Sequence, residues 1–432
     1  MAGTYNTQNK VRPGVYINFS SEKPLAVELS DRGVVALPLS LSWGKIGEIT
    51  VVHQGDSTWE NFGYELTEPK LLLLKEALKR AKTALVYRIN NGEAATATLA
   101  ANVIATAKYK GARGNDISVK IAANSSAWDV TTLVSGNVVD TQTVSDIDSF
   151  IENNWISISG SGSFEPATLT LAGGSDDNSN LDHNGFLSAL LVQDYDCIAC
   201  FATAADDQSL YIGHVKAERE NAGKMVSVVM PENAADKEYV ISVSNGIKLS
   251  DGTLLSASDA CAWMAGATAA SLVNQNLTFS KYEDAVDAYP RRTHEETVAA
   301  INVGHVVFTS KAGIVVVEYD INTLTSFASP KSKAWRSNRV MRVLDSFQTD
   351  VQTIFESQYI GKVSNDDEGR QLFRSAIIEY CKELQRLGAL QNFEGAADIT
   401  VTAGTDEDAV LITAALQPVD SVNKIYIKVN VG

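Results

Sequence analysis

The chain begins and ends in stretches that alternate apolar and polar residues, and these two stretches constrain its fold more than any other feature. The first is KVRPGVYINF, from Lys10 to Phe19, and the second is SVNKIYIKVNVG, the last twelve residues. Alternation with a period of two is typical of β-strands. A strand at a chain end exposes a row of backbone groups that need hydrogen-bond partners. The sequence therefore raises the question of what these two strands pair with.

Each terminal strand has one apolar face. Pro13 has no backbone N–H, so it fits a strand only at an edge or at the start. One way to satisfy such strands is addition to the sheet edge of another subunit, and the alternative of pairing within the same chain stays open at this stage. The residues that we assign to intersubunit strands are Val11, Pro13, Gly14, Val15, Tyr16, Ile17 and Phe19 in the first, and Ile425, Tyr426, Ile427, Val429 and Val431 in the second.

Length and charge exclude several classes of protein. The 432 residues are enough for about two to four domains, and the formal net charge of −16 argues against a general nucleic-acid binder. No run approaches the length of apolar sequence that spans a membrane, and the first ten residues do not resemble a signal peptide. We therefore expect no direct nucleic-acid contact, no membrane insertion, and a protein that stays in the cytoplasm or leaves by lysis.

The middle of the chain changes character twice. Residues 96–177 contain short alternating strands with turns every 8–12 positions, which predicts a small all-β module, a sandwich or a barrel. Gly173–Asn180 reads as the linker out of this module. Residues 178–335 alternate apolar strands with helical stretches, as in a layered α/β domain. Residues 336–390 predict two long helices, and residues 68–84 predict one shorter helix with Pro69 in its first turn.

Candidate catalytic motifs fail on residue identity. Met225 ends a stretch that resembles a phosphate-binding loop, but it stands where Ser or Thr would hold magnesium. Val298 stands where a zinc-protease helix needs its second histidine. Cys197 and Cys200 lie in a buried-strand pattern, so we interpret them as core residues on opposite faces rather than as a redox pair. Lys110–Asp116, with its two glycines, reads as a hairpin turn. The sequence predicts no enzyme, metal site or cofactor.

Charged side chains gather in a few places. The five histidines are scattered, and only a triad assembled from distant parts of the chain stays open. Short acidic clusters, such as Asp406–Asp408, read as solvated loops and helix starts. One basic run, PKSKAWRSNRVMR, contains no acid and is either a contact for an acidic partner or a solvated helix face. This basic patch consists of Lys331, Lys333, Arg336, Arg339 and Arg342, joined on the following helix by Arg370 and Arg374.

The order of these parts resembles the tail sheath proteins of contractile bacteriophages, and equally the sheaths of phage-derived contractile bacteriocins. The most specific pieces are Arg12–Ile17 and Val419–Val431, whereas the inserted β module and the α/β region between them are far less distinctive. The resemblance implies stacked six-subunit rings around an inner tube, with both terminal arms adding strands to neighbouring subunits. It carries over no catalytic residue. On this reading, the terminal strands pair with other copies of the same protein.

The resemblance also implies a domain plan. We expect an α/β and α+β multidomain fold with a discontinuous N/C-terminal assembly domain, extended terminal strands, an inserted β-sandwich or barrel, and an α/β layered domain. The segments are an N-terminal arm at 1–20, assembly-domain parts at 21–95 and 336–418, the all-β insertion at 96–177, the α/β domain at 178–335 and a C-terminal arm strand at 419–432.

The implied function is that of a contractile sheath subunit, which drives a tube through a target envelope with energy stored in subunit packing. Its expected partners are other copies of itself, an inner tube protein that the basic patch faces, and baseplate and tail terminator proteins. It is expected in a virion tail or phage-tail-like particle that assembles in the bacterial cytoplasm. The competing classes are a soluble cytoplasmic α/β enzyme with an unrecognised active site, and a binding module carried by the β insertion.

Overall fold

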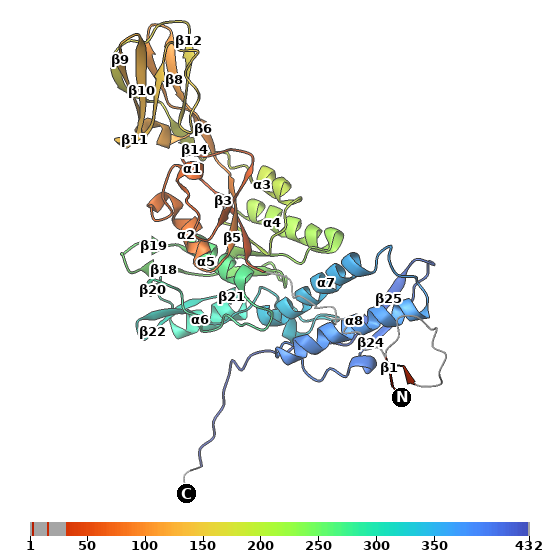
Figure 1. Cartoon of the computed structure of the whole chain (residues 1–432). Coiled ribbons are helices and arrows are strands. Elements are labelled where there is room, and N and C mark those ends of the chain that lie inside the picture. Colours follow the sequence, from red (N-terminus) through yellow and green to blue (C-terminus); the bar gives the residue numbers. More distant parts are fainter. Residues whose placement is uncertain (1, 4–14, 17–31, 431–432) are drawn as a thin grey trace.

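The computed structural model of the chain describes residues 2–3, 15–16 and 32–430. Three parts follow one another in space: a β-sandwich at one end, an α/β body in the middle, and a C-terminal body of two long helices (Figure 1). Near the N-terminus, β1 (Ala2–Gly3) pairs in parallel with β2 (Val15–Tyr16). Of the terminal residues assigned to intersubunit strands, those outside the described residues are Val11, Pro13, Gly14, Ile17, Phe19 and Val431.

The α/β body is built on a seven-stranded sheet in the order β21-β17-β16-β15-β3-β5-β4. All neighbours pair in parallel except β4, which is antiparallel to β5. The strands are β3 (Val34–Leu39), β4 (Ile49–His53), β5 (Thr83–Arg88), β15 (Cys197–Ala199), β16 (Ser227–Pro231), β17 (Val240–Val243) and β21 (His305–Val306).

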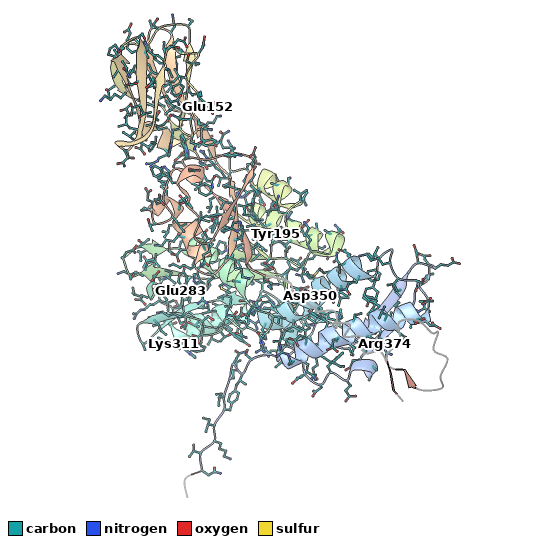
Figure 2. The ribbon with its side chains drawn as sticks, viewed as in Figure 1. Glu152, Tyr195, Glu283, Lys311, Asp350 and Arg374 are labelled. Atoms are coloured by element: carbon teal, nitrogen blue, oxygen red, sulfur yellow. The ribbon has the colours of Figure 1, made fainter. Side chains whose placement is uncertain are left out.

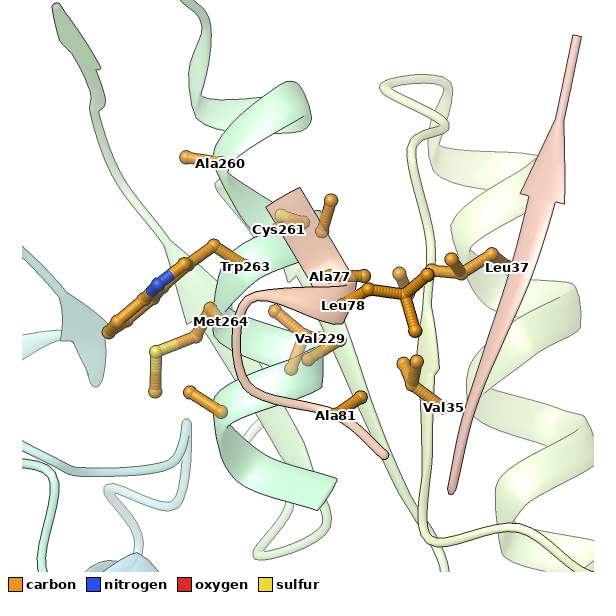
Figure 3. Close-up of a cluster of buried hydrophobic side chains, with 14 of the residues drawn as sticks. Val35, Leu37, Ala77, Leu78, Ala81, Val229, Ala260, Cys261, Trp263 and Met264 are labelled. Carbon is orange, nitrogen blue, oxygen red and sulfur yellow. The ribbon is translucent and has the colours of Figure 1, made fainter. Parts of the chain in front are cut away.

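Helices cover both faces of this sheet. One face packs against α2 (Leu72–Leu78) and α5 (Ala257–Ala270), which bury the core shown in Figure 3. The other face packs against α3 (His183–Leu190) and α4 (Ala205–Ala217). Cys197 belongs to the first core and Cys200 to the second, and burial raises the pKa of both thiols to about 12. The prediction of two core cysteines on opposite faces is confirmed.

The sheet corrects one part of the predicted domain plan. We expected residues 21–95 to form one domain with residues 336–418, but β3 pairs directly with β15 of the α/β region. The physical reason is that both faces of β3 are apolar, with Val35 and Leu37 on one side and Ala36 on the other, all fully buried. Such a strand needs helices on both sides. The described residues from Gly33 to Arg88 therefore belong to the α/β body.

Smaller elements complete the α/β body. A three-stranded sheet contains β18 (Gly246–Leu249), β19 (Leu254–Leu255) and β20 (Ala285–Tyr289), and β22 (Phe308–Lys311) forms a hairpin with β23 (Ile314–Val317). α1 (Trp59–Phe62) precedes α2, and α6 (His294–Asn302) starts at a capping box on Thr293. Within the described residues, no group of His, Cys, Asp and Glu is placed to hold a metal ion, and no helix is long and apolar enough to cross a bilayer.

The all-β insertion is a sandwich, as one of the two predicted forms. Its sheets have the orders β12-β8-β7 and β11-β10-β9-β13. The strands are β7 (Thr96–Ala100), β8 (Val103–Ala107), β9 (Ile117–Asn124), β10 (Ala127–Val134), β11 (Asn137–Val144), β12 (Ile156–Gly160) and β13 (Ala167–Thr170). The stretch Lys110–Asp116 is not a hairpin turn, because β8 and β9 belong to different sheets, which it joins.

The exit from the sandwich is more ordered than a linker. β14 (Ser175–Asp177) pairs with β6 (Asn91–Glu93), so the entering and leaving chains form a two-stranded ribbon. Gly92 has a φ of +153°, and a Cβ there would lie 1.9 Å from the carbonyl oxygen of Ser175. The segment Gly173–Asn180, predicted as the linker out of the module, does lead out of the sandwich, and its residues Ser175–Asp177 form a paired strand there.

The C-terminal body contains α7 (Asn338–Gln358), α8 (Asp367–Arg386), and a hairpin of β24 (Ile399–Ala403) and β25 (Val410–Ala414). The two predicted long helices are confirmed. The apolar stripe of α8, with Phe373, Ile377 and Leu384 buried, packs against α7 and the hairpin in a core separate from the α/β cores. Among the described residues, this hairpin and the C-terminal segment after it have backbone groups of strand type without a strand partner.

Candidate assembly interface

The C-terminal arm leaves the body without pairing to it. Residues 419–430 form no strand within the described part of the chain, and from Val422 onward the arm projects away from the body (Figure 1). Tyr426 is 90% exposed and Ile427 is 81% exposed. Exposing a run of apolar β-forming side chains is unfavourable for an isolated soluble chain. The arm therefore has the residue pattern of a β-strand, but no strand among the described residues pairs with it.

The root of the arm, in contrast, is held firmly. The backbone N–H of Val419 donates to the carbonyl oxygen of Ala389 at 2.9 Å. Asp420 accepts a hydrogen bond from the Ser337 hydroxyl at 2.9 Å, and an Arg339 guanidinium nitrogen donates to the Ser421 hydroxyl at 2.6 Å. These contacts fix the point and direction from which the arm leaves, at the first turn of α7.

The β24–β25 hairpin presents an open strand edge. At one end of the ladder the backbone N–H of Ala415 donates to the carbonyl oxygen of Asp398. At the other end the backbone N–H of Gly404 donates to the carbonyl oxygen of Ala409. Because paired residues alternate in an antiparallel ladder, the N–H and C=O groups of Val410, Ile412 and Ala414 point away from β24. Among the described residues, no hydrogen bond occupies these groups. β25 can therefore accept one more strand along its outer edge.

An apolar groove runs beside this edge. A cavity of about 580 Å³ lies between β25 and α7, and an adjoining cavity of about 560 Å³ extends towards the end of α7. Both are lined by Phe355, Phe373 and Val410. A strand added to β25 would place every second side chain over this groove, because side chains alternate across a strand. The groove therefore favours an added strand with one apolar face, which is what both terminal stretches carry.

The basic patch is not the exposed surface that its sequence suggested. Arg342 is 4% exposed, and one of its guanidinium nitrogens lies 2.7 Å from a carboxylate oxygen of the fully buried Asp320. Its assignment to a tube-facing surface is wrong, because its charge is used inside the protein. Arg342 also donates to the carbonyl oxygen of Gln275 at 2.8 Å, so the run of positive charges in the sequence is not a run on the surface.

Most of the other members of the patch also have partners within the chain. Lys331 pairs with Glu238 at 2.7 Å, Arg336 donates to the carbonyl oxygen of Ile301, and Arg370 pairs with Asp367. Arg374, labelled on α8 in Figure 2, donates to the carbonyl oxygen of Ile399 at 2.7 Å. Of the seven residues, all of them described, only Lys333 is both exposed and without an ion pair.

The Arg342–Asp320 pair belongs to a seam between the C-terminal body and the α/β body. Asp320 also accepts hydrogen bonds from the Asn338 amide at 2.7 Å and from the backbone N–H of Leu277 at 2.9 Å. A second pair, Arg219 with Asp345, is bidentate with distances of 2.6 and 3.0 Å. Buried, bidentate pairs with further hydrogen bonds hold two parts in one geometry. The open edge of β25 is therefore carried on a rigidly attached body.

Sequence reasoning missed two parts of this interface. The arm root at Ser337, Arg339 and Asp420 joins residues more than 80 positions apart, which no local pattern reveals. The acidic turn Asp406–Asp408 was interpreted as a solvated loop, and it is exposed, but it also closes the hairpin whose outer edge is open. A signal was available: these three consecutive carboxylates have no basic residue near them in the sequence.

The α/β body contains the cavity that an enzyme would use. It has a volume of about 380 Å³ and lies after the carboxyl ends of β3 and β15, with Lys70, His183 and Asp207 in its lining. The buried imidazole of His183 shares a hydrogen bond with the Tyr211 hydroxyl at 2.8 Å, and burial lowers the pKa of His183. Among the described residues, no serine or cysteine forms a hydrogen bond with His183. The geometry therefore does not form a nucleophilic triad there.

Comparison with known proteins identifies relatives over the whole chain. Four family profiles match consecutive segments: "Tail sheath protein Gp18 domain III N-terminal region" at residues 32–89, "Phage tail sheath protein beta-sandwich domain" at 90–177, "Phage tail sheath protein central domain" at 176–323 and "Phage tail sheath C-terminal domain" at 330–432.

Individual relatives agree with these profiles. Protein XkdK of the phage-like element PBSX from Bacillus subtilis is 34% identical, over 100% of this chain and 99% of that protein. The crystal structure of a sheath tail protein from Desulfitobacterium hafniense is 43% identical, with a TM-score of 0.87 over 96% of this chain and 99% of that one. The helical sheath of the anti-feeding prophage in its contracted state shares the fold, at 13% identity, a TM-score of 0.58 and coverage of 98% and 99%.

Proposed function

The chain belongs to the phage tail sheath protein family, and on this premise we propose that it polymerises as stacked hexameric rings around an inner tube and contracts to drive that tube through a target envelope. Its site of action is a virion tail or phage-tail-like particle, assembled in the cytoplasm of the bacterial host. The family suggests a structural, non-enzymatic protein, and the energy for contraction is held in subunit packing rather than supplied by a nucleotide.

One observation carries the assembly part of this proposal: the chain has both an open receptor and a free strand of matching chemistry. The receptor is the outer edge of β25 with its apolar groove, and the strand is the exposed arm with Ile425, Ile427 and Val429 on one face. Backbone pairing supplies affinity and the apolar side chains fix register. A second copy satisfies both, so a repeating assembly follows from these two features.

The apolar side chains of the arm also set the strength of each contact between subunits. A fully buried Ile or Val side chain contributes about 1.5–3 kcal/mol, so three of them per arm hold a neighbour firmly. The N-terminal arm, with Val15 and Tyr16 among its described residues, carries the same alternation and is proposed to add to a neighbour in the same manner. Two arms per subunit, each reaching a different neighbour, connect subunits into a mesh that stays linked while the subunits move.

We also propose contacts with other proteins of the particle. The inner tube protein, the baseplate and the tail terminator are the partners that a sheath subunit needs. The tube contact is narrower than the sequence suggested, since Arg342 is buried and Lys333 is the exposed, unpaired member of the basic patch. Exposed charge contacts are worth about 0–1 kcal/mol each, which suits a surface that must release its tube on contraction.

Electron microscopy of the purified full-length chain tests the proposal. We expect rings or striated tubes, and a variant that lacks residues 421–432 should remain a folded monomer with an unchanged melting temperature. A matched variant that lacks residues 91–177 controls for deletion as such and should still assemble. It also carries Trp43→Ser, because the buried Trp43 ring packs in the sandwich core and the deletion would expose it. A full-length protein that stays monomeric at all concentrations, or a truncated protein that builds normal tubes, would contradict the proposal.

A further inference from the structure

The turn that joins β24 to β25 carries an unusual concentration of unpaired negative charge. Asp406, Glu407 and Asp408 are consecutive and exposed. Within the described part of the chain, none of the three forms a salt bridge with a lysine or arginine, although such pairs are common elsewhere in the molecule. Three like charges on one turn repel one another, and no lysine or arginine among the described residues forms a salt bridge with them.

The C-terminal arm carries the opposite charge on the face away from its apolar residues. Lys424 and Lys428 are the only charged residues after Asp420, and neither forms an ion pair in the structure. The Lys424 ammonium lies 6.0 Å from the ring centre of Tyr319, which leaves it without a carboxylate partner. The arm is therefore a strand with an apolar face and a basic face.

Geometry brings these charges together when the arm of one copy lies along β25 of another. If the arm is parallel to β25 with Ile427 beside Ile412, Lys424 lies beside Ala409, the residue that follows the turn. If the arm is antiparallel in the same register, Lys428 lies beside Leu411, three residues or about 10 Å from Asp408. In either direction the apolar face covers the groove, and the parallel direction is the one that places a lysine at the acidic turn.

We propose that the acidic turn Asp406–Asp408 of one subunit binds the lysines of the C-terminal arm of a second copy, and that this charge contact selects the register of the added strand. The inference rests on the proposed function, since it needs the arm to pair with β25. The apolar face alone repeats every two residues, so a slip by two positions keeps it buried. A slip by two positions away from the turn moves each lysine by about 7 Å along β25 and breaks the charge contact, which makes the turn a register marker against that slip.

Reciprocal charge reversal tests the contact. The arm variant Lys424→Glu/Lys428→Glu and the turn variant Asp406→Lys/Asp408→Lys should each raise the critical concentration for assembly by about tenfold. The chain that combines all four substitutions should return to within about threefold of the original. The readout is light scattering of the full-length chain against protein concentration, with electron microscopy to verify that the scattering objects are sheaths. The melting temperature of each monomer checks that the fold is kept.

A matched control separates the contact from net charge. Lys216→Glu/Lys382→Glu makes the same change in charge at two exposed lysines outside the arm and should leave the critical concentration nearly unchanged. If single reversals have no effect, or if the combined chain is not rescued, the acidic turn does not bind the arm. Deletion of residues 421–432 decides the proposed function separately, because it removes strand pairing whether or not the charges matter.

Discussion

Ile198 and Ile427 are the same residue type, and both lie in stretches predicted as β-strands, yet one is fully buried and the other is 81% exposed. Ile198 lies in β15, with β16 on one side, β3 on the other and helices over both faces. Ile427 lies in an arm that is held at its root and at Lys424 but pairs with no strand among the described residues. The difference is not in local sequence preference but in whether the rest of the chain supplies a sheet to receive the strand.

The α/β body and the C-terminal body differ in whether their strands find all their partners within the same chain. The α/β body satisfies its own strands and packs α5, buried along nearly its whole length, against β3, β15 and β16. The C-terminal body keeps an open edge on β25, and the arm keeps an open strand. Under the proposed function, another copy of the chain supplies the sheet for the exposed arm and the strand for the groove.

The largest expected effect comes from placing a charge in each of the two stretches. Ile198→Asp buries a carboxylate in the middle of a parallel sheet without a partner, and we expect the protein to lose its fold, because this desolvation costs several kcal/mol. Ile427→Asp should leave the melting temperature unchanged and abolish assembly, since the arm is exposed in the monomer and loses its fit to the groove only on pairing. Circular dichroism and light scattering measure the two effects separately.

The outcome that would break the comparison is an arm variant that melts early. In that case the arm would contribute to the monomer, and the exposed position of Ile427 would not describe the protein in solution. Ile427→Val is the conservative control, and it should change neither stability nor assembly by more than a small factor.

How much of this could be predicted follows the same division. The core strands, the two long helices and the sandwich carry periodic apolar patterns, so the sequence indicates them directly, and the terminal strands stand out by the same alternation. What the patterns cannot reveal is which strand lies beside which. β3 looked like a separate domain because 81 residues, 94–174, separate β6 from β14 in sequence, while the ribbon that these two form closes the gap in space.

The basic patch illustrates the limit for charged residues. Arg339 and Arg342 are three positions apart on α7, and in sequence they read as one surface. In the structure one donates to the arm root and the other is buried against Asp320. The two side chains share a helix face but lie one turn apart, so different segments of the chain lie beside them. Partners such as Asp320 lie in another body, so charge patterning alone could not assign them.

The second prediction concerns the seam that carries the open edge. Arg342→Met removes the partner of the fully buried Asp320, and we expect a loss of about 3–5 kcal/mol in the free energy of unfolding. Lys333→Met, from the same run of sequence but exposed, should change it by less than about 0.5 kcal/mol. Urea denaturation of both variants makes the measurement. Equal and small effects would mean that Arg342 lies at the surface after all, and the tube-facing assignment would return.

A smaller effect is expected at the arm root. Arg339→Ala removes the hydrogen bond to Ser421 and one to the Gly388 carbonyl, so the arm leaves the body over a wider range of directions. Its ordering on pairing then costs more, by about 1 kcal/mol, which raises the critical concentration of assembly roughly fivefold. Arg339→Lys should recover part of the loss. A variant with normal assembly would show that the arm finds its receptor without a fixed root.

The smallest expected effect is a difference in how the stability of the α/β body and that of the C-terminal body depend on pH. Burial lowers the pKa of His183, His214 and His305, all in the α/β body, whereas residues 338–430 contain no histidine. Asp207 beside His183 and Glu218 beside His214 oppose this shift without cancelling it. Because the unfolded chain binds protons more readily at these sites, their contribution to stability is present above pH 6.5, the ordinary pKa of the unfolded imidazole, and is lost as the pH falls below it.

Hydrogen exchange can resolve where that loss occurs. Between about pH 7.5 and pH 5.5, protection factors corrected for intrinsic exchange should fall for amides of β15 and β16 and change less for amides of α8. His183→Gln/His214→Gln should flatten the response of the α/β body, while His53→Gln, at an exposed position, should not. An equal fall in both bodies, unaffected by the substitutions, would mean that the seam transmits the loss and that the two bodies unfold as one unit. The open edge of β25 would then depend on the α/β body for its stability as well as for its position.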